Sequence, residues 1–488
     1  MRIFPKNLVL TLSASLFFFP YLKPLQAQAQ CGSRLIGFYT YYNSNYRSTK
    51  IPFNQLTHIC HAFVNINPDG SITAPSGYLE PYLITTAHAN GVRVLTSIGG
   101  ADVTTFSGVA ANPAYTATFV NQVYQFIQTN GYDGVDIDWE FPETSADLSN
   151  EAGFFQALRN KFNSSPTPAP SWDISFDIEG NSYWGAWQDY SNVSNYVSFY
   201  NVMSYSASGA WADHTNHNTA IYTGTDPYGD ETWQSDVAYL TTTRGVPPSK
   251  INMGVPFYGV QFPSQNGLYV ACGGYCPGVA NPNYSQLVPL IGTSATRTWD
   301  SGSLVPYLTN GPGFITYDDT ESVTIKVNYA LGTAKLGGLF IWELSQDYMA
   351  DTTQPLLSTM YTAVQALGIP TCTPTITPTP VPTATPYVVP TLAPPVLYAN
   401  PVTIGSSTNL QLPMLSSPSN VKIQLFTVAF RKVQDVTIQN QVPGGPCACV
   451  TLPINLIDNW GNTLANGLYY VVITDADGTF TQKLLILK

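Results

Sequence analysis

Short apolar runs of strand length recur along roughly the first two thirds of this 488-residue chain, separated by segments long enough for helices. Strands that alternate with helical segments predict β-α-β units and a parallel sheet. Eight runs over about 310 residues predict a closed (β/α)8 barrel, a fold that typically takes about 250 residues. The runs cover residues 35–39, 58–65, 93–98, 134–139, 173–178, 198–204, 252–256 and 338–342.

The interval between the last two runs is the longest, and we place an inserted α+β segment there, near residues 260–316. We expect the barrel domain to span residues 30–367. In (β/α)8 barrels the active site lies where the strands end, at their C-terminal side. Chemistry is therefore expected where these apolar runs stop.

A stretch without charged side chains, residues 352–421, marks a change of organisation. Residues 371–395 within it hold eight Pro and eight Thr. Proline fixes φ and removes a backbone donor, so we expect residues 368–395 to be an extended spacer. Residues 396–488 then alternate apolar and polar side chains between turn signals, which predicts a small β-sandwich.

The charge balance is acidic: Lys and Arg total 19 against 30 Asp and Glu, a formal net charge of −11. An acidic chain without basic runs is a poor ligand for nucleic acids or anionic membranes. Only 10% of the residues are charged and 13% are aromatic, which suits a neutral ligand with polar faces. Carbohydrate is the first candidate class, and we expect no cofactor.

The N-terminus has the pattern of a secretory signal peptide. Arg2 and Lys6 precede an apolar core, and Ala27 and Ala29 form a small-x-small cleavage site. An uncleaved anchor is the alternative, but the apolar core is shorter than the ~20 residues that a spanning helix needs. We expect residues 1–29 to be removed from a secreted protein without a membrane span.

Seven cysteines are an odd number for an exported chain. Cys272 and Cys276 flank Gly-Gly-Tyr and are close enough to close a small loop, whereas Cys60 lies in an apolar run and is expected to be a buried thiol. Cys447 and Cys449 are too close in sequence to pair without strain. No cysteine has zinc-site spacing with a histidine, so we expect no metal.

The most informative single segment is the acidic run 133–140, Asp-Gly-Val-Asp-Ile-Asp-Trp-Glu. On a strand, Asp136, Asp138 and Glu140 point to one face and the large apolar residues between them to the other. Like charges this close resist simultaneous ionisation, so at least one pKa should rise. Glu140, the outermost, is best placed to act as a general acid.

Two other interpretations of this run fit less well. A calcium site needs oxygen ligands on a flexible loop, whereas Val135 and Ile137 favour a strand. A solvated acidic face is also disfavoured, because the alternating apolar residues are large and the run has no basic partner. We therefore favour catalysis.

Residues 133–140 resemble the DxxDxDxE signature of family 18 glycoside hydrolases, the chitinases and their relatives. Further segments resemble motifs of that family in the same order along the chain, and together they span most of residues 35–347. They are 37–39 at the end of the first strand, 95–100 for the SxGG strand, 203–205 for the MxY strand, 254–259 for the seventh strand and 337–342 for the eighth.

The resemblance implies retaining hydrolysis of β-1,4 bonds beside N-acetylglucosamine, with the substrate's acetamide as nucleophile, an exception to the usual pair of carboxylates. Glu140 would protonate the glycosidic oxygen and then activate water. Asp138 would orient the acetamide and stabilise the positive charge of the intermediate, and Asp136 would share a proton with Asp138. Tyr205 would hydrogen-bond the acetamide oxygen, and Trp342 would form an apolar floor under the sugar.

Four further residues complete the implied site. Tyr39, at the end of the first run, is expected to line the same pocket, and Trp211 to line an extended cleft. Asp133 and Ser97 are expected to support the acidic strand rather than to take part directly.

Two features concern how this chain differs within the family. Ser206 follows Tyr205 at a position where many members carry an acidic residue or Asn. Serine hydrogen-bonds a sugar but carries no charge, which leaves the pH optimum open. The inserted segment, including residues 297–300, resembles the α+β insertion that deepens the cleft in one chitinase subgroup, and a deep cleft favours longer oligomers.

The C-terminal segments 398–402, 467–470 and 485–488 resemble immunoglobulin-like domains at the ends of bacterial secreted proteins. Some of those domains act as sorting or surface-attachment signals, which is the interpretation that we favour here. A carbohydrate-binding module, with Trp460 and Tyr469 as its platform, is the alternative.

The combined prediction is a secreted chitinase whose partners are chitin or chito-oligosaccharides, with cell-surface attachment or secretion machinery as a further partner of the C-terminal domain. One alternative is a chitin-binding, lectin-like protein without turnover, against which the intact Glu140 argues. Another is an endo-N-acetylglucosaminidase that acts on N-glycans or peptidoglycan.

Overall fold

The computed structural model describes residues 32–100, 103–164, 172–369, 396–398, 400–403, 408–412, 419–428, 431–441, 450–475 and 478–487. The expected signal peptide 1–29, nearly all of the expected spacer 368–395, and Cys447 and Cys449 lie outside these residues. The chain divides into two compact units, which meet in sequence after residue 376. Each unit is described by itself below.

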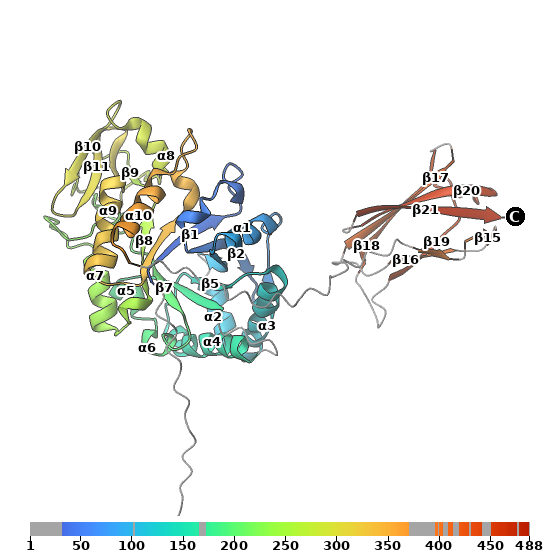
Figure 1. Cartoon of the computed structure of the whole chain (residues 1–488), viewed down its shortest axis with the longest axis horizontal. Coiled ribbons are helices and arrows are strands. Elements are labelled where there is room, and N and C mark those ends of the chain that lie inside the picture. Colours follow the sequence, from blue (N-terminus) through green and yellow to red (C-terminus); the bar gives the residue numbers. More distant parts are fainter. Residues whose placement is uncertain are drawn as a thin grey trace, which may run out of the picture. The chain divides into compact units, whose positions relative to one another are not determined.

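Eight parallel strands form the closed barrel that the apolar runs predict (Figure 1). Their order is β1-β13-β8-β7-β6-β5-β4-β2, and β1 closes the barrel by pairing also with β2. The strands are β1 Arg34–Thr40, β2 His58–Ile66, β4 Arg93–Gly100, β5 Gly134–Trp139, β6 Asp173–Ile178, β7 Phe199–Val202, β8 Ile251–Pro256 and β13 Gly338–Trp342, and the short β3 Ile72–Thr73 pairs with β2.

Helices lie around the outside of these strands (Figure 1). They include α1 Pro81–Ala89, α2 Val103–Ala111, α3 Pro113–Asn130, α4 Ser145–Asn163, α5 Ser182–Gly185, α6 Tyr190–Val193, α7 Trp233–Ala238, α9 Thr320–Val327 and α10 Pro355–Ala366. Local sequence sets their ends. Thr144 and Asp147 form a capping box that starts α4 five residues after β5, which fixes the chain just beyond the acidic strand.

The predicted insertion lies between β8 and β13. Its strands β9 Val260–Phe262, β10 Thr296–Asp300, β11 Val305–Gly311 and β12 Gly313–Thr316 form an antiparallel sheet in the order β10-β11-β12-β9, with the short helix α8 Tyr284–Leu287. Cys272 and Cys276 form a disulfide within this insertion. Cys60, on β2, is a buried free thiol as predicted.

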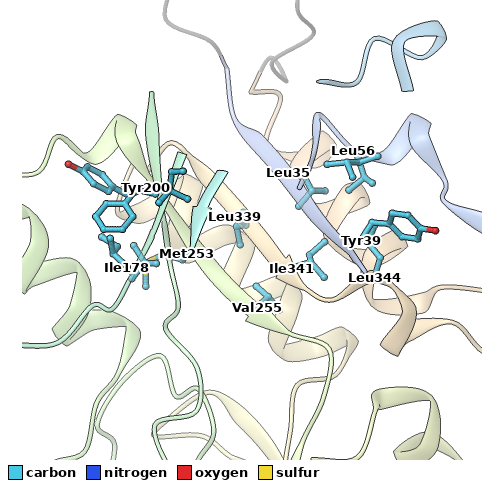
Figure 2. Close-up of a cluster of buried hydrophobic side chains, with 14 of the residues drawn as sticks. Leu35, Tyr39, Leu56, Ile178, Tyr200, Met253, Val255, Leu339, Ile341 and Leu344 are labelled. Atoms are coloured by element: carbon cyan, nitrogen blue, oxygen red, sulfur yellow. The ribbon is translucent and has the colours of Figure 1, made fainter. Parts of the chain in front are cut away.

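The barrel strands carry two apolar layers, because successive side chains point to opposite faces. One layer packs between strands and helices, and Figure 2 shows part of it, with Leu35, Leu339 and Ile341 pointing into one cluster. The other layer lies inside the barrel and includes Phe38 and Phe340. Adjacent residues of one strand therefore have unrelated surroundings, which decides which side chains reach the site.

The second unit consists of two β-sheets that share one apolar core, as expected for a small sandwich. Leu410 and Leu452 of the first sheet and Val471 and Leu484 of the second belong to that core. The sheets are β14-β16-β19 and β15-β21-β20-β17-β18, with β14 Val396–Tyr398, β15 Val402–Thr403, β16 Thr408–Leu412, β17 Ser419–Thr427, β18 Lys432–Gln441, β19 Val450–Ile454, β20 Gly467–Asp475 and β21 Gly478–Leu487.

Trp460 is 63% exposed, whereas Tyr469 is buried and donates its hydroxyl to the carbonyl of Ala465. Tyr469 is therefore no part of an exposed sugar-binding platform, which weakens the carbohydrate-module alternative. Among the helices of the described residues, none combines the length and apolarity that crossing a membrane requires.

A fully buried ion pair connects α9 to the short segment between β12 and α9. Lys326 Nζ lies 2.6 Å from Asp318 Oδ2, neither side chain is exposed, and Lys326 also donates to Thr219 Oγ1 at 3.1 Å. Burial raises the pKa of Asp318 and lowers that of Lys326, while each charge stabilises the other. Such a pair contributes little net stability but is costly to break.

We predict that Lys326→Met lowers the free energy of unfolding of the first unit by about 3–5 kcal/mol, because it leaves a buried carboxylate without its partner. Urea unfolding of the full chain at neutral pH, followed by tryptophan fluorescence, measures this loss. The double variant Asp318→Asn/Lys326→Met removes both charges and should recover part of it. A single variant as stable as the wild type would contradict the prediction.

Candidate active site

A pocket opens at the C-terminal end of the barrel strands, where the sequence placed the chemistry. Residues of β1, β5, β6 and β13 and of the segments after β5, β7 and β8 contribute to it, and its lining combines carboxyl groups with aromatic side chains. The lining residues are Phe38, Asp138, Glu140, Asp177, Met203, Tyr205, Ser206, Tyr258 and Trp342.

The acidic strand β5 has the predicted alternation. Asp136 and Asp138 are buried inside the barrel, at 0% and 3% exposure, and Glu140 follows half-buried at the strand's end. The residues between them, including Trp139, point outward into the layer against the helices. The three carboxyl groups therefore follow one another along the barrel interior toward the pocket, and Asp138 and Glu140 line it.

Asp136, the innermost carboxyl group, is held by donors from three neighbouring strands. Ser97 Oγ donates to Oδ2 at 2.7 Å, and Ser175 Oγ and Asn201 Nδ2 both donate to Oδ1, the latter at 3.2 Å. Ser97 thus lies where the sequence placed it, as a support of the acidic strand. These donors oppose the effect of burial, which raises the pKa of Asp136.

Asp138 differs from Asp136 because one of its carboxyl oxygens receives no hydrogen bond. Its Oδ1 is buried and has no hydrogen-bond partner, although the group lines the pocket. Burial, Glu140 and Asp136 together raise the pKa of Asp138 well above its usual value. A buried carboxyl oxygen without a partner lacks a hydrogen-bond donor, and a ligand bound in the pocket is able to supply one.

Glu140 has the environment of a general acid. Burial of its carboxyl group raises its pKa above the usual value of a glutamic acid. A carboxyl group that keeps its proton toward neutral pH, at the mouth of a pocket, is able to protonate a leaving group.

Aromatic rings form the rest of the pocket. Trp342 packs edge-on against Phe38 at 5.4 Å and stacks on Phe63 at 5.7 Å, measured between ring centroids. Tyr205 meets Tyr258 at 6.2 Å in a T-shaped pair. Tyr205 and Trp342 both line the pocket, and its aromatic rings suit the C–H face of a sugar ring.

Ser206 is fixed at the pocket edge rather than free. Its hydroxyl shares a 2.7 Å hydrogen bond with the hydroxyl of Tyr258, and its backbone N–H donates to Asn218 Oδ1 at 2.8 Å. Ser206 therefore places a neutral hydroxyl pair next to the carboxyl groups.

The prediction that Tyr39 lines the pocket is wrong. Its side chain is fully buried on the opposite face of β1, beside Leu344 (Figure 2), and its hydroxyl donates to Glu80 Oε1 at 2.5 Å. Phe38, its neighbour, points into the barrel and lines the pocket instead. Applying the period of two from a known inward residue such as Ile36 would have chosen Phe38.

Two other predicted residues lie away from the pocket lining. Trp211 is 59% exposed and is not among the lining residues, so a contact with substrate further out stays a prediction. Asp133 lies before β5, at the opposite end of the strand, where its Oδ2 accepts from the N–H of Val94 and contacts His88 Nε2, both at 2.8 Å. It ties the start of β5 to its neighbours.

A comparison with models of protein families shows to which family the chain belongs. The model of the glycosyl hydrolases family 18 matches residues 34–347, which include all eight barrel strands and the insertion. The chain belongs to family 18. Its first domain is a glycoside hydrolase domain, and the resemblance noted in the sequence motifs is confirmed.

Curated relatives of this family 18 chain match it partially. A probable endochitinase of Caenorhabditis elegans is 30% identical over 272 residues, which is 52% of this chain and 44% of that protein. The chain spans about half the length of the first curated relatives that it matches.

Solved family 18 structures share the barrel. The Ostrinia furnacalis group IV chitinase, in complex with allosamidin, superimposes with a TM-score of 0.63 at 24% identity and covers 69% of this chain and 99% of its own. A chitinase-like agglutinin of Robinia pseudoacacia gives 0.60 at 24% identity, over 67% of this chain and 99% of its own. Likeness at this identity shows the fold alone, and the fold is shared by proteins named for different activities.

Sequence reasoning missed two polar members of the pocket of this family 18 chain. Asp177 ends the run 173–178, and Tyr258 follows the seventh strand. Asp177 lies two residues after the inward-facing Ser175, so the strand period was a usable signal. Within the described residues, no group of three His, Cys, Asp or Glu side chains is arranged to hold a metal ion.

Proposed function

We propose that the first domain is a chitinase that hydrolyses β-1,4 bonds next to N-acetylglucosamine in chitin or chito-oligosaccharides. The observation that carries the proposal is the pair Asp138 and Glu140 at the pocket. Glu140 is a half-buried acid that lines the pocket, and Asp138 beside it has an unpartnered oxygen. The family resemblance implies that the substrate's own acetamide, oriented by Asp138, acts as the nucleophile in place of a second carboxylate.

In this mechanism the substrate's acetamide oxygen attacks the anomeric carbon while Glu140 protonates the departing glycosidic oxygen. Asp138 accepts the acetamide N–H and stabilises the positive charge of the resulting ring intermediate. Tyr205 donates to the acetamide oxygen, and Trp342 supports the apolar face of the sugar. Glu140, now ionised, activates the water that opens the intermediate, so the configuration at the anomeric carbon is retained.

Hydrolysis of 4-methylumbelliferyl N,N′-diacetylchitobioside by the full chain tests the proposal. The matched control is the cellobioside, which has the same linkage but no acetamide, and should not be cleaved. Proton NMR of chito-oligosaccharide cleavage should show the β-anomer first, as retention requires. Chitin binding without turnover would instead support the lectin alternative, and cleavage of N-glycans or peptidoglycan only would support the third.

We also propose that the protein is exported and that the C-terminal sandwich, by its immunoglobulin-like sequence segments, serves in sorting or surface attachment. The charge pattern of residues 1–29 supports export, and the disulfide between Cys272 and Cys276 is typical of an oxidising compartment. Fractionation of producing cells, with and without residues 396–488, tests whether that domain retains the enzyme at the surface.

A further inference from the structure

A fourth carboxyl group, Asp177 at the end of β6, lies in the same pocket without a role in the mechanism above. It is 1% exposed and lines the pocket together with Asp138 and Glu140. Strand β6 pairs with β5 on one side and β7 on the other, so Asp177 stands beside both the acidic strand and Asn201. The hydrogen bonds around Asp177 indicate whether its carboxyl group is protonated.

A chain of amides fixes which atoms donate to the carboxyl groups. Arg34 Nε donates to Asn252 Oδ1 at 2.8 Å, and a guanidinium only donates. The amide of Asn252 must then donate through Nδ2 to Asn201 Oδ1, at 3.1 Å. Asn201 Nδ2 is consequently the donor to both carboxyl groups, at 3.2 Å to Asp136 Oδ1 and 2.8 Å to Asp177 Oδ1.

Asp136 is the acceptor in this cluster. Ser97, Ser175 and Asn201 all donate to it, and hydrogen bonds that a carboxyl group accepts favour its ionised form. Asp136 and Asp177 are both buried and share the Nδ2 of Asn201 as a donor, so the two carboxyl groups lie close together. Two buried carboxyl groups this close resist ionising together, and because three groups donate to Asp136, we assign the proton to Asp177.

The charges around Asp177 agree with this assignment. Burial raises its pKa well above the usual value, and Asp136 and Asp138 on β5 raise it further. The other titratable groups that interact with it are Cys60 on β2 and Tyr205 beyond β7, whose own pKa values burial raises, so that they stay neutral. Neither brings a positive charge that would favour the ionised form.

Asp138 Oδ1, by contrast, is buried and receives no hydrogen bond. We propose that Asp177 is a positioning residue that replaces Asp138 as the proton-sharing partner of Asp136, so that Asp138 is already released toward the sugar in the free enzyme. This inference rests on the proposed function, and it changes one role that the family resemblance implies: the shared proton lies between Asp136 and Asp177 instead of between Asp136 and Asp138. Asp177 keeps its proton throughout, and no bond is made or broken there.

Two variants of the full chain separate this role from simple packing. Asp177→Asn keeps the shape and an N–H donor for Asp136, so kcat on the chitobioside should stay within about threefold of wild type. Asp177→Ala removes the donor, so Asp138 must bond to Asp136 and be freed in every turnover. We expect kcat to fall about tenfold, the effect of about one hydrogen bond, with KM within about threefold.

Infrared spectroscopy at neutral pH locates the proton without any substrate. Asp177→Asn should lose one carbonyl band of a protonated carboxyl group. Glu151→Gln is the matched control: Glu151 is buried on α4, outside the pocket lining, and burial raises its pKa to about 8. This control should lose a band of its own and keep the wild-type kcat.

The proposal is overturned if Asp177→Asn retains every protonated-carboxyl band, because the proton would then lie elsewhere. It is also overturned if the Asn and Ala variants lose equal activity. A wild-type protein that cleaves no chitobioside would refute the proposed function, whereas the band would still decide the protonation of Asp177.

Discussion

Glu140→Gln should abolish nearly all hydrolysis of the chitobioside, lowering kcat about 10²- to 10⁴-fold, the usual contribution of a positioned general acid. Glutamine has the shape of glutamic acid, but it has no proton to give to the leaving oxygen and cannot act as the base that activates water in the second step. The pocket is otherwise unchanged, since Glu140 is half-buried at the strand's end and the aromatic walls do not depend on it. Chito-oligosaccharide binding should therefore persist.

The measurement is a pair: kcat from the fluorogenic substrate, and affinity for a chito-oligosaccharide from quenching of tryptophan fluorescence. Glu143→Gln is the control, because Glu143 is an exposed carboxylate three residues further along. It should behave like the wild type in both measurements. Persistent turnover in Glu140→Gln would refute the assignment of the acid, and loss of binding along with turnover would point to misfolding.

The pH dependence follows from the same group. The proposed acid works only while protonated, so activity is lost as the pH rises through the pKa of Glu140. Burial raises that pKa, which moves the basic side of the kcat profile toward neutral pH compared with an exposed glutamic acid. Ser206 brings no charge to the pocket edge, where its hydroxyl bonds to Tyr258.

The barrel was predictable because each of its strands is buried on both faces and so reads as a continuous apolar run in the sequence. Gly134–Trp139 even keeps its predicted bounds, since turn residues precede it and a proline follows Phe141. The acidic residues stood out for the opposite reason: carboxyl groups inside such a run are costly unless chemistry needs them.

What the sequence left undecided is which strands meet around the pocket and with which register. Tyr39 and Phe38 are equally aromatic neighbours, and only the orientation of β1 separates a pocket wall from a helix-facing core residue. Asp177 looked like one more polar residue in β6. Its importance comes from Asn201 on the next strand, a contact between residues 24 apart that no local pattern reveals.

Asp138→Asn should lower kcat about 10²- to 10³-fold, the effect of removing one electrostatic contact that acts mainly in the transition state. The asparagine is isosteric and keeps an oxygen for the acetamide N–H, but it has no negative charge to stabilise the positive intermediate. Binding of a stable thiazoline analogue of that intermediate should weaken by a similar factor, while binding of the uncharged product changes little.

Two further results make this second prediction specific to Asp138. Because Asp138 and Glu140 interact through charge, removing the carboxylate of Asp138 should lower the pKa of Glu140 and move the basic side of the pH profile to lower pH while the whole curve drops. Asp133→Asn, the same change at the other end of the strand, should lower thermal stability through Val94 and His88 but leave kcat within about threefold, since loss of a hydrogen bond outside the pocket acts on folding. Equal loss of kcat in both variants would show that the effect arises from the strand's packing, and the substrate-assisted mechanism would lose its main support.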